Sequence, residues 1–135
     1  MDMYTEIYVK AVLKKGVDDN VVNIIKYMLG IDDVELEDVT IPSHNLFETD
    51  RWDSMLRSGS YYHVPYTVKL FEYNDISENY YLVVRSDFKN YQDEIEKFFD
   101  WIKQYLEQDY YKTFIGYSLY EDDEPKLYYV EGYDL

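Results

Sequence analysis

Apolar and polar residues alternate along residues 6–15, which is the pattern of a strand with one buried face. Along residues 16–30 the apolar residues instead return every three or four positions, which is the spacing of an amphipathic helix. Asp18 or Asp19 is placed to cap this helix at its start, and Gly30 is placed to end it. The pattern therefore predicts a strand followed by a short helix.

The pattern is less regular between residues 31 and 59. Acidic and apolar residues alternate over residues 32–38, which predicts an edge strand or an extended loop. Thr49 or Asp50 is placed to cap one or two helical turns that end at Gly59. The apolar residues of these turns, which are expected to close one end of the core, are Trp52, Met55 and Leu56.

Two antiparallel hairpins are predicted in the rest of the chain. Residues 61–75 and 78–88 are rich in the β-branched and aromatic residues that strands favour, and they flank a short turn. The residues expected to share one face of each strand are Tyr66, Val68 and Leu70 in the first, and Tyr80, Leu82 and Val84 in the second. Residues 112–133 predict a second hairpin that turns at Glu121–Pro125.

The clearest helical pattern lies between these hairpins, at residues 90–108, with Asn90 placed as its cap. Its apolar stripe consists of Ile95, Phe98, Phe99, Ile102 and Leu106. Helices with one apolar stripe each must bury it against the sheet, so both are expected on the same face. The sequence predicts a single α+β domain over residues 1–135, with an antiparallel sheet of four to five strands and two amphipathic helices on one face. This is a ferredoxin-like or related two-layer sandwich.

The net charge departs from that of an ordinary small domain. The chain carries 28 acidic and 13 basic residues, which leave a net charge of −15. Nucleic acids and anionic membranes are bound through basic surfaces, so this charge argues against both as direct partners. It favours a partner with a basic protein surface, and the alternative is an acid-rich or salt-adapted host proteome.

Other features exclude several kinds of site. The chain has no cysteine, so it has neither disulfides nor thiolate metal sites, and a reducing host-cell cytoplasm is the expected location. It shows no run of about 18 apolar residues and no signal-peptide pattern. His44 and His63 have no spacing that selects a catalytic or metal site, and phosphate-binding glycine motifs are absent. We therefore expect no cofactor, no metal and no enzymatic activity.

Tyrosines and acidic residues suggest where a partner would bind. The chain has 18 tyrosines, a residue type that is frequent in interfaces, although cross-strand packing is the alternative role. Carboxylates along a twisted sheet can also approach the charge density of duplex DNA, which carries one charge per ~1.7 Å of axis. The expected partner-binding residues are Asp32, Asp33, Glu35, Glu37 and Asp38 in one segment, and Tyr120, Glu121, Asp122, Asp123, Glu124 and Tyr128 in another.

Three motifs carry a resemblance to known proteins: ETDRW-x-x-MLR-x-x-SYY from residue 48, F-x-x-WI-x-x-YL from residue 98, and FIGY-x-x-YE from residue 114. From Leu46 onward the chain resembles a group of small, acidic, uncharacterised phage and prophage proteins. In size and acidity it is also similar to phage anti-CRISPR and anti-restriction proteins. The resemblance implies an accessory phage product and assigns no residue a role.

The hypothesis that follows is a non-enzymatic phage or prophage protein that binds and inhibits a basic, nucleic-acid-binding surface of a host defence complex, with DNA mimicry as one means. The partner would be a host nuclease or a related complex, and the protein itself would be a monomer or a homodimer. One alternative is an immunity or antitoxin-like protein that blocks a toxin. The other is a small protein for a nucleotide-type ligand that uses Arg51, Arg57, Arg85, the histidines and tyrosines.

Overall fold

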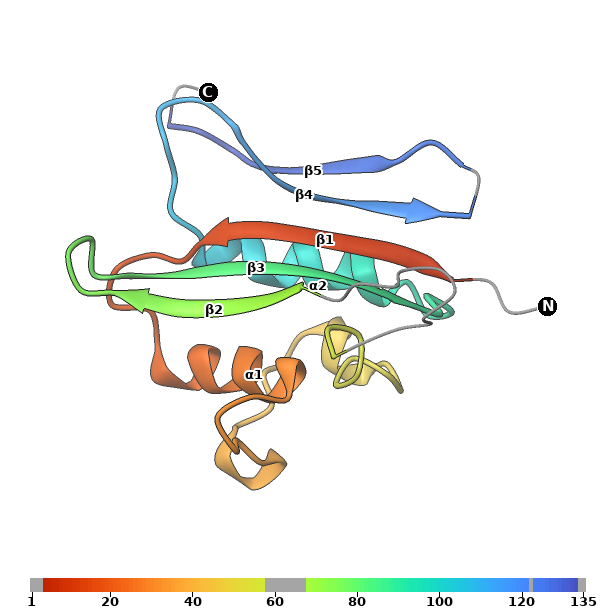
Figure 1. The fold of residues 1–135 in the computed structure, drawn as a ribbon, viewed down its shortest axis with the longest axis horizontal. Coiled ribbons are helices and arrows are strands. Elements are labelled where there is room, and N and C mark those ends of the chain that lie inside the picture. Colours follow the sequence, from red (N-terminus) through yellow and green to blue (C-terminus); the bar gives the residue numbers. More distant parts are fainter. Residues whose placement is uncertain (1–3, 58–67, 122, 134–135) are drawn as a thin grey trace.

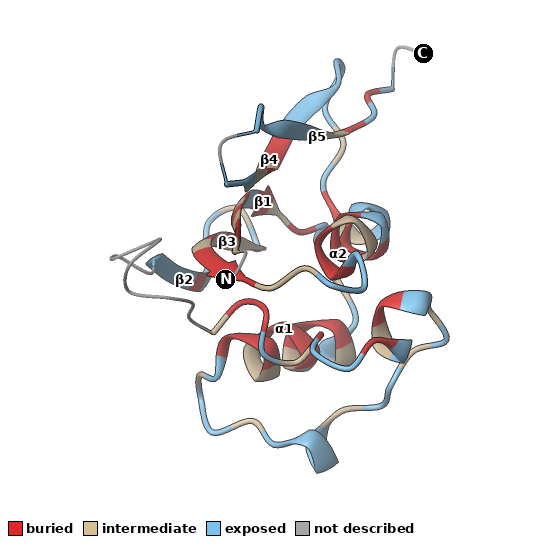
Figure 2. Ribbon diagram, turned by 90° about the vertical axis from the view of Figure 1, so that its right-hand side faces the viewer, coloured by how far each residue is buried: buried red, intermediate tan, exposed pale blue. Residues whose placement is uncertain are grey.

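The fold is described by a computed structural model for residues 4–57, 68–121 and 123–133. The strands are β1 (Thr5–Val12), β2 (Val68–Asn74), β3 (Asn79–Phe88), β4 (Thr113–Tyr120) and β5 (Lys126–Val130). They form one antiparallel sheet in the order β2-β3-β1-β4-β5. The helices α1 (Asp19–Leu29) and α2 (Glu94–Ile102) cover one face of it (Figures 1 and 2). The predicted α+β two-layer sandwich is confirmed, and β5 extends the β-α-β-β-α-β element order of ferredoxin-like folds.

Helix α1 begins and ends as its capping residues predict. The Asp18 side chain accepts a hydrogen bond from the backbone N–H of Asn20, which would otherwise lack a partner in the first turn. Gly30 adopts the left-handed conformation with φ 71° and closes the last turn. The residues that α1 buries against the sheet are Val21, Val22, Ile24, Ile25, Met28 and Leu29.

Helix α2 buries the predicted stripe but begins later than Asn90. Asp93 precedes the first helical residue in a left-handed conformation, and its side chain makes no capping hydrogen bond. The Asn90 side chain instead reaches forward and accepts a hydrogen bond from the backbone N–H of Ile95. The helix continues as one 3-10 turn, η3 (Lys103–Tyr105). All the stripe residues are buried, namely Ile95, Phe98, Phe99, Ile102 and Leu106.

The acidic segment after α1 is not a strand. Residues 31–57 contain no strand, and residues 32–38 include the single 3-10 turn η1 (Leu36–Asp38). The Glu35 and Asp38 side chains each accept a hydrogen bond from the other residue's backbone, which closes this turn as a capping box. Of the two predicted alternatives, the edge strand is therefore wrong, and the segment is a loop with one 3-10 turn. Local capping by the carboxylates competes with sheet pairing.

The helical turns predicted after Thr49 or Asp50 are replaced by less regular structure. A 3-10 turn, η2 (Asn45–Glu48), ends at Thr49, and residues 51–57 form bends and turns. The predicted end at Gly59 lies outside the described residues. The apolar residues of this segment nevertheless join the core as predicted, and they are Trp52, Met55 and Leu56.

Strand β2 turns a different face to the helices than its sequence predicts. Phe71 pairs with Leu82 and is buried on the helix side, whereas Leu70 pairs with Val83 on the open face. Val68 is likewise exposed, and Tyr66 lies outside the described residues. Apolar residues occupy both the odd-numbered and the even-numbered positions of this strand, so alternation alone does not select the buried face.

A bulge at Ile115 interrupts β4 and brings the next residue close to β1. A Cβ atom at Gly116 would lie 2.1 Å from the backbone oxygen of Tyr8 and 2.8 Å from the Phe99 ring. Glycine is therefore required where β1 and β4 approach each other beneath α2. Beyond this contact the two strands separate, because their pairing ends at Val9 and Gly116.

Candidate functional site

A cleft of about 460 Å³ lies between the start of α2, the end of β4 and the turn that joins β4 to β5. We call it the acidic cleft. Its lining residues are Thr5, Asn90, Tyr91, Asp93, Glu96, Ser118, Tyr120, Asp123, Glu124 and Lys126. Four of these carry carboxylates and two carry phenol rings, against one ammonium group. The cleft thus joins part of the predicted C-terminal site to residues of α2.

Glu96 is the carboxylate of the cleft that is most affected by its surroundings. Burial raises the pKa of Glu96, and the neighbouring Asp93 raises it further. Two groups oppose this shift of the pKa: Asn90, which donates a hydrogen bond of 2.9 Å to the carboxylate, and Lys126. A cation in the cleft would stabilise the ionised form of Glu96.

The two tyrosines give the cleft partly exposed aromatic walls. Tyr91 is 63% exposed and Tyr120 is 37% exposed. The guanidinium of Arg51 lies 5.1 Å from the centre of the Tyr91 ring, so this ring already interacts with a cation. Carboxylates beside tyrosine rings are a favourable environment for an arginine or lysine side chain.

The predicted site residues at positions 120–124 divide into three groups. Asp123 and Glu124 line the cleft with Tyr120. The Glu121 carboxylate accepts a hydrogen bond of 3.1 Å from the backbone N–H of Tyr4, so it is used within the fold. Asp122 lies outside the described residues.

Tyr128 is half-buried and packs against the core. Its ring stacks on Phe99 with centroids 3.9 Å apart, and its hydroxyl lies 3.2 Å from the Ser118 hydroxyl. Burial raises the pKa of Tyr128. We therefore assign Tyr128 to the packing of β5 on α2.

The first predicted acidic segment lies far from the acidic cleft. It lies below α1 in Figure 1, whereas β4 and β5 form the upper part of the molecule. Asp32 forms an ion pair of 3.3 Å with Lys26, and Glu35 and Asp38 close the capping box described above. Asp33 and Glu37 remain exposed. The two predicted segments do not form one continuous carboxylate array.

The cleft residues on and before α2 were not predicted as site residues. Asp93 and Glu96 lie about one helical turn apart, which places both carboxylates near the same end of the helix. A cluster of acids at the start of a helix is ordinarily explained by the helix dipole, so it gave no separate signal. Only the fold shows that this end of α2 faces the C-terminal hairpin.

Several tyrosines on the open face of the sheet pack across strands. The Tyr8 and Tyr117 rings stack with centroids 5.3 Å apart. The Tyr117 hydroxyl donates a hydrogen bond to Glu6, which also pairs with Arg85 at 3.3 Å. Burial and the Glu6 contact raise the pKa of Tyr117 to about 12. Cross-strand packing, the alternative role for tyrosine, therefore accounts for this pair.

The three arginines proposed for a nucleotide-type ligand do not converge on one site. Arg51 stacks on Tyr91, and Arg57 donates a hydrogen bond of 2.9 Å to the backbone oxygen of Tyr27. Arg85 pairs with Glu6 on the open face. Each guanidinium thus has a partner within the fold, in a different part of the molecule.

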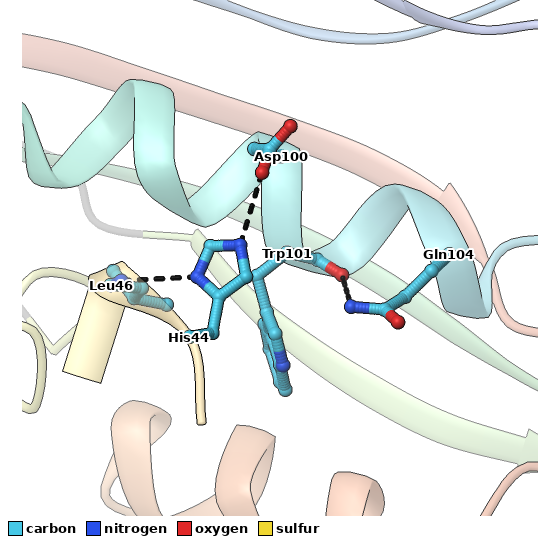
Figure 3. A network of polar contacts seen from close by, with 5 residues as sticks. All are labelled: His44, Leu46, Asp100, Trp101 and Gln104. Atoms are coloured by element: carbon cyan, nitrogen blue, oxygen red, sulfur yellow. Dashed lines mark hydrogen bonds and ion pairs between the residues drawn. The ribbon is translucent and has the colours of Figure 1, made fainter. Parts of the chain in front are cut away.

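His44 has a structural role that its sequence context did not reveal (Figure 3). Its Nδ1 accepts a hydrogen bond of 3.0 Å from the backbone N–H of Leu46 and caps η2. Since Nδ1 is an acceptor, neutral His44 carries its proton on Nε2, which lies 3.0 Å from the Asp100 carboxylate. Both ring nitrogens are therefore engaged, and His63 lies outside the described residues.

We expect His44→Ala to lower the free energy of unfolding by about 1 kcal/mol, because η2 loses its side-chain cap. His44→Asn should recover most of this stability, since asparagine is also a good capping residue. Urea denaturation followed by tryptophan fluorescence measures both changes. Equal losses in the two variants would show that capping is not the role of this residue.

The sequence matches no model of a known protein family, no curated protein and no solved structure. Among the described residues, no group of three or more histidines, aspartates or glutamates is arranged to hold a metal ion. No helix in the same part of the chain is long and apolar enough to cross a membrane. The acidic cleft is therefore the feature from which a function is inferred.

Proposed function

We propose that this protein is a non-enzymatic inhibitor that binds a basic, nucleic-acid-binding surface of a host defence complex and receives arginine or lysine side chains in its acidic cleft. The observation that carries this proposal is the convergence of four carboxylates and two tyrosine rings on one cleft of about 460 Å³. Basic side chains that ordinarily contact phosphates would contact these carboxylates instead.

The charge of the whole protein supports the same kind of partner. Some carboxylates of the described residues pair with the protein's own cations, as Asp32 does with Lys26 and Glu6 does with Arg85, each at 3.3 Å. With a net charge of −15, most carboxylates are not neutralised by the protein's own cations. Such an excess attracts a basic surface over long range and speeds association.

A pair of charge-matched variants tests the location of the binding surface. Asp123→Lys with Glu124→Lys reverses two charges in the cleft, and Glu37→Lys with Glu48→Lys makes the same change at exposed positions elsewhere. The wild type is first used to isolate its partner from host lysate, and association rates are then measured with the purified partner at several salt concentrations. The cleft variant should associate about tenfold more slowly at low salt, whereas the matched variant should change much less.

Salt dependence provides the second readout. Exposed charges are screened over ~8 Å at physiological ionic strength, so the wild-type association rate should fall steeply as salt rises. The cleft variant should show a shallower dependence. A salt-independent affinity, or equal losses in both variants, would contradict binding at the cleft. Recovery of a single toxin from the lysate would favour the antitoxin-like alternative.

The pKa of Glu96 adds a dependence on pH. Because this pKa is raised above its ordinary value of 4.5, a bound cation favours loss of the proton, and affinity should increase as pH rises through it. The stability of the free protein depends on pH in the opposite direction. The folded state holds the proton more tightly, so stability decreases as pH rises from 4.5 to the folded pKa. Glu96→Gln should remove both effects, as measured by calorimetry and by urea denaturation.

A further inference from the structure

The open face of the sheet, which lies opposite α1 and α2, consists largely of apolar and aromatic side chains. No helix covers this face in the described parts of the chain (Figure 2). Residues directly opposite each other on paired strands point to the same side, so the register identifies the members of the face. One row crosses all five strands and consists of Val68, Arg85, Tyr8, Tyr117 and Leu127. The other apolar and aromatic members are Val12, Leu70, Tyr81, Val83, Phe114, Leu119 and Tyr129.

The central strands also have the sequence of strands that are covered on both faces. β1 contains the run IYVKAV from Ile7, and β3 contains the run YYLVV from Tyr80. A strand with one face in water alternates apolar and polar residues, whereas a strand buried on both faces is apolar almost throughout. Leu70 is nevertheless 37% exposed, and Leu127 is 52% exposed. The open face therefore has the character of a surface that another layer covers.

The open face carries little accessible net charge, although the whole chain carries −15. Glu6 and Arg85 pair with each other at 3.3 Å, and Asp87 is completely buried. The other charged side chains of the strands on this face, Lys10 and Glu72, are exposed and opposite in sign. A basic partner is attracted to the carboxylates elsewhere on the molecule. Two copies of the chain, in contrast, approach each other with the least repulsion through this face.

We infer that two copies of this chain associate through their open faces and form a symmetric dimer, with the two sheets packed on each other and the helices outside. Side chains of two packed sheets interdigitate, and their strands lie within about 30° of each other. A two-fold axis that runs along β3 meets this condition and brings β1 of each copy over β2 of the other. The centre of the interface then contains Leu70, Tyr81 and Val83.

The two exposed charges of the open face suit this arrangement. Lys10 lies on β1 and Glu72 lies on β2, on either side of β3. When β1 of one copy lies over β2 of the other, Lys10 of each copy is within side-chain reach of Glu72 of the other copy. The two-fold symmetry makes this contact twice. Opposite charges that meet in this way fix the orientation of an interface.

This inference goes beyond the proposed function, because no residue of the open face lines the acidic cleft. Both acidic clefts of the dimer lie outside the interface, so a partner with two basic surfaces would gain affinity from the linkage of two contacts. Dimerisation is measured with the purified protein alone. Its failure would leave the proposed function as it stands, and failure of partner binding would leave the dimer.

Sedimentation equilibrium of the purified wild type tests the dimer directly, and the mass should be twice the 16.4 kDa of one chain. Because two chains of the same net charge repel each other, the dimer should become tighter as salt rises, whereas the partner binding proposed above becomes weaker. A monomer at every salt concentration, up to the highest protein concentration that stays in solution, would overturn the inference.

A pair of matched variants locates the interface. Leu70→Lys places a charge at the centre of the two packed sheets and should raise the dissociation constant of the dimer by about tenfold or more. Leu36→Lys makes the same change at a residue that is 51% exposed in η1, away from the sheet, and should have little effect. Circular dichroism checks that both variants fold. Equal dissociation constants for the two variants would contradict association through the open face.

An exchange of charges tests the orientation. Lys10→Glu and Glu72→Lys should each weaken the dimer about tenfold, because each substitution brings like charges together twice in the interface. An equimolar mixture of the two variants should recover dimerisation, since both contacts between unlike copies again join opposite charges. Net charge alone predicts a different result, because Glu72→Lys makes the chain less negative and would strengthen the dimer. A mixture that remains monomeric would overturn the proposed arrangement.

Discussion

Replacing Gly116 with alanine is expected to lower the free energy of unfolding by about 3 kcal/mol or more, because the new Cβ atom has no space. It would lie 2.1 Å from the backbone oxygen of Tyr8 and 2.8 Å from the Phe99 ring. The first contact is with backbone in the middle of the sheet, so relief requires β1 and β4 to move apart. Urea denaturation followed by far-ultraviolet circular dichroism measures the loss.

Gly16→Ala is the control for this experiment. Gly16 has a left-handed conformation with φ 69°, but no atom lies within 4 Å of the position that its Cβ would occupy. Its substitution should therefore cost only about 1 kcal/mol of backbone strain. Similar losses for the two variants would show that β1 and β4 do not approach as closely as described.

Truncation of the α2 stripe should have an effect of similar size. Phe98→Ala and Phe99→Ala are each expected to lower the free energy of unfolding by about 3–5 kcal/mol, since both rings are fully buried. Phe99 also stacks on Tyr128, with an angle of 9° between the ring planes, and so joins α2 to β5. Lys103→Ala, at an exposed position just after the helix, should change stability by no more than about 0.5 kcal/mol.

The two phenylalanine variants are measured in the same urea experiments as the control. Losses below about 1 kcal/mol for both phenylalanines would place the wrong face of α2 in the core. A large loss for Phe98 with a small loss for Phe99 would show that β5 packs less closely on the helix. Either result would mean that the acidic cleft does not lie where it is described, because its position depends on how α2 and β5 pack together.

Packing also limits which substitutions are suitable for testing the proposed function. Tyr128→Ala would remove a stacked ring and the hydroxyl contact with Ser118, so weaker partner binding could follow from a changed fold. Asp123 and Glu124 are exposed members of the acidic cleft. Their substitution changes the charge of the cleft with little loss of packing, and they are therefore the informative positions.

The sequence by itself determined the helices α1 and α2, the five strands and the order in which they follow one another. The stripe of α2 and the caps of α1 were predictable because a helix buries residues that return every three or four positions, and capping residues act on their nearest backbone groups. Asp18 and Gly30 act within a few residues along the chain, so no distant contact decides their role. The α+β class followed from this local information together with the alternation of β1.

Only the tertiary structure decided the buried face of β2, the turn at residues 36–38 and the composition of the acidic cleft. Phe71 and Leu70 are both apolar, so pairing with β3 had to select the one that faces the helices. The cleft joins Asp93 and Glu96 to Asp123 and Glu124, which are distant in sequence and meet only after α2 packs against β4 and β5. Contacts of this kind depend on the packing of whole elements, which no local pattern of residues specifies.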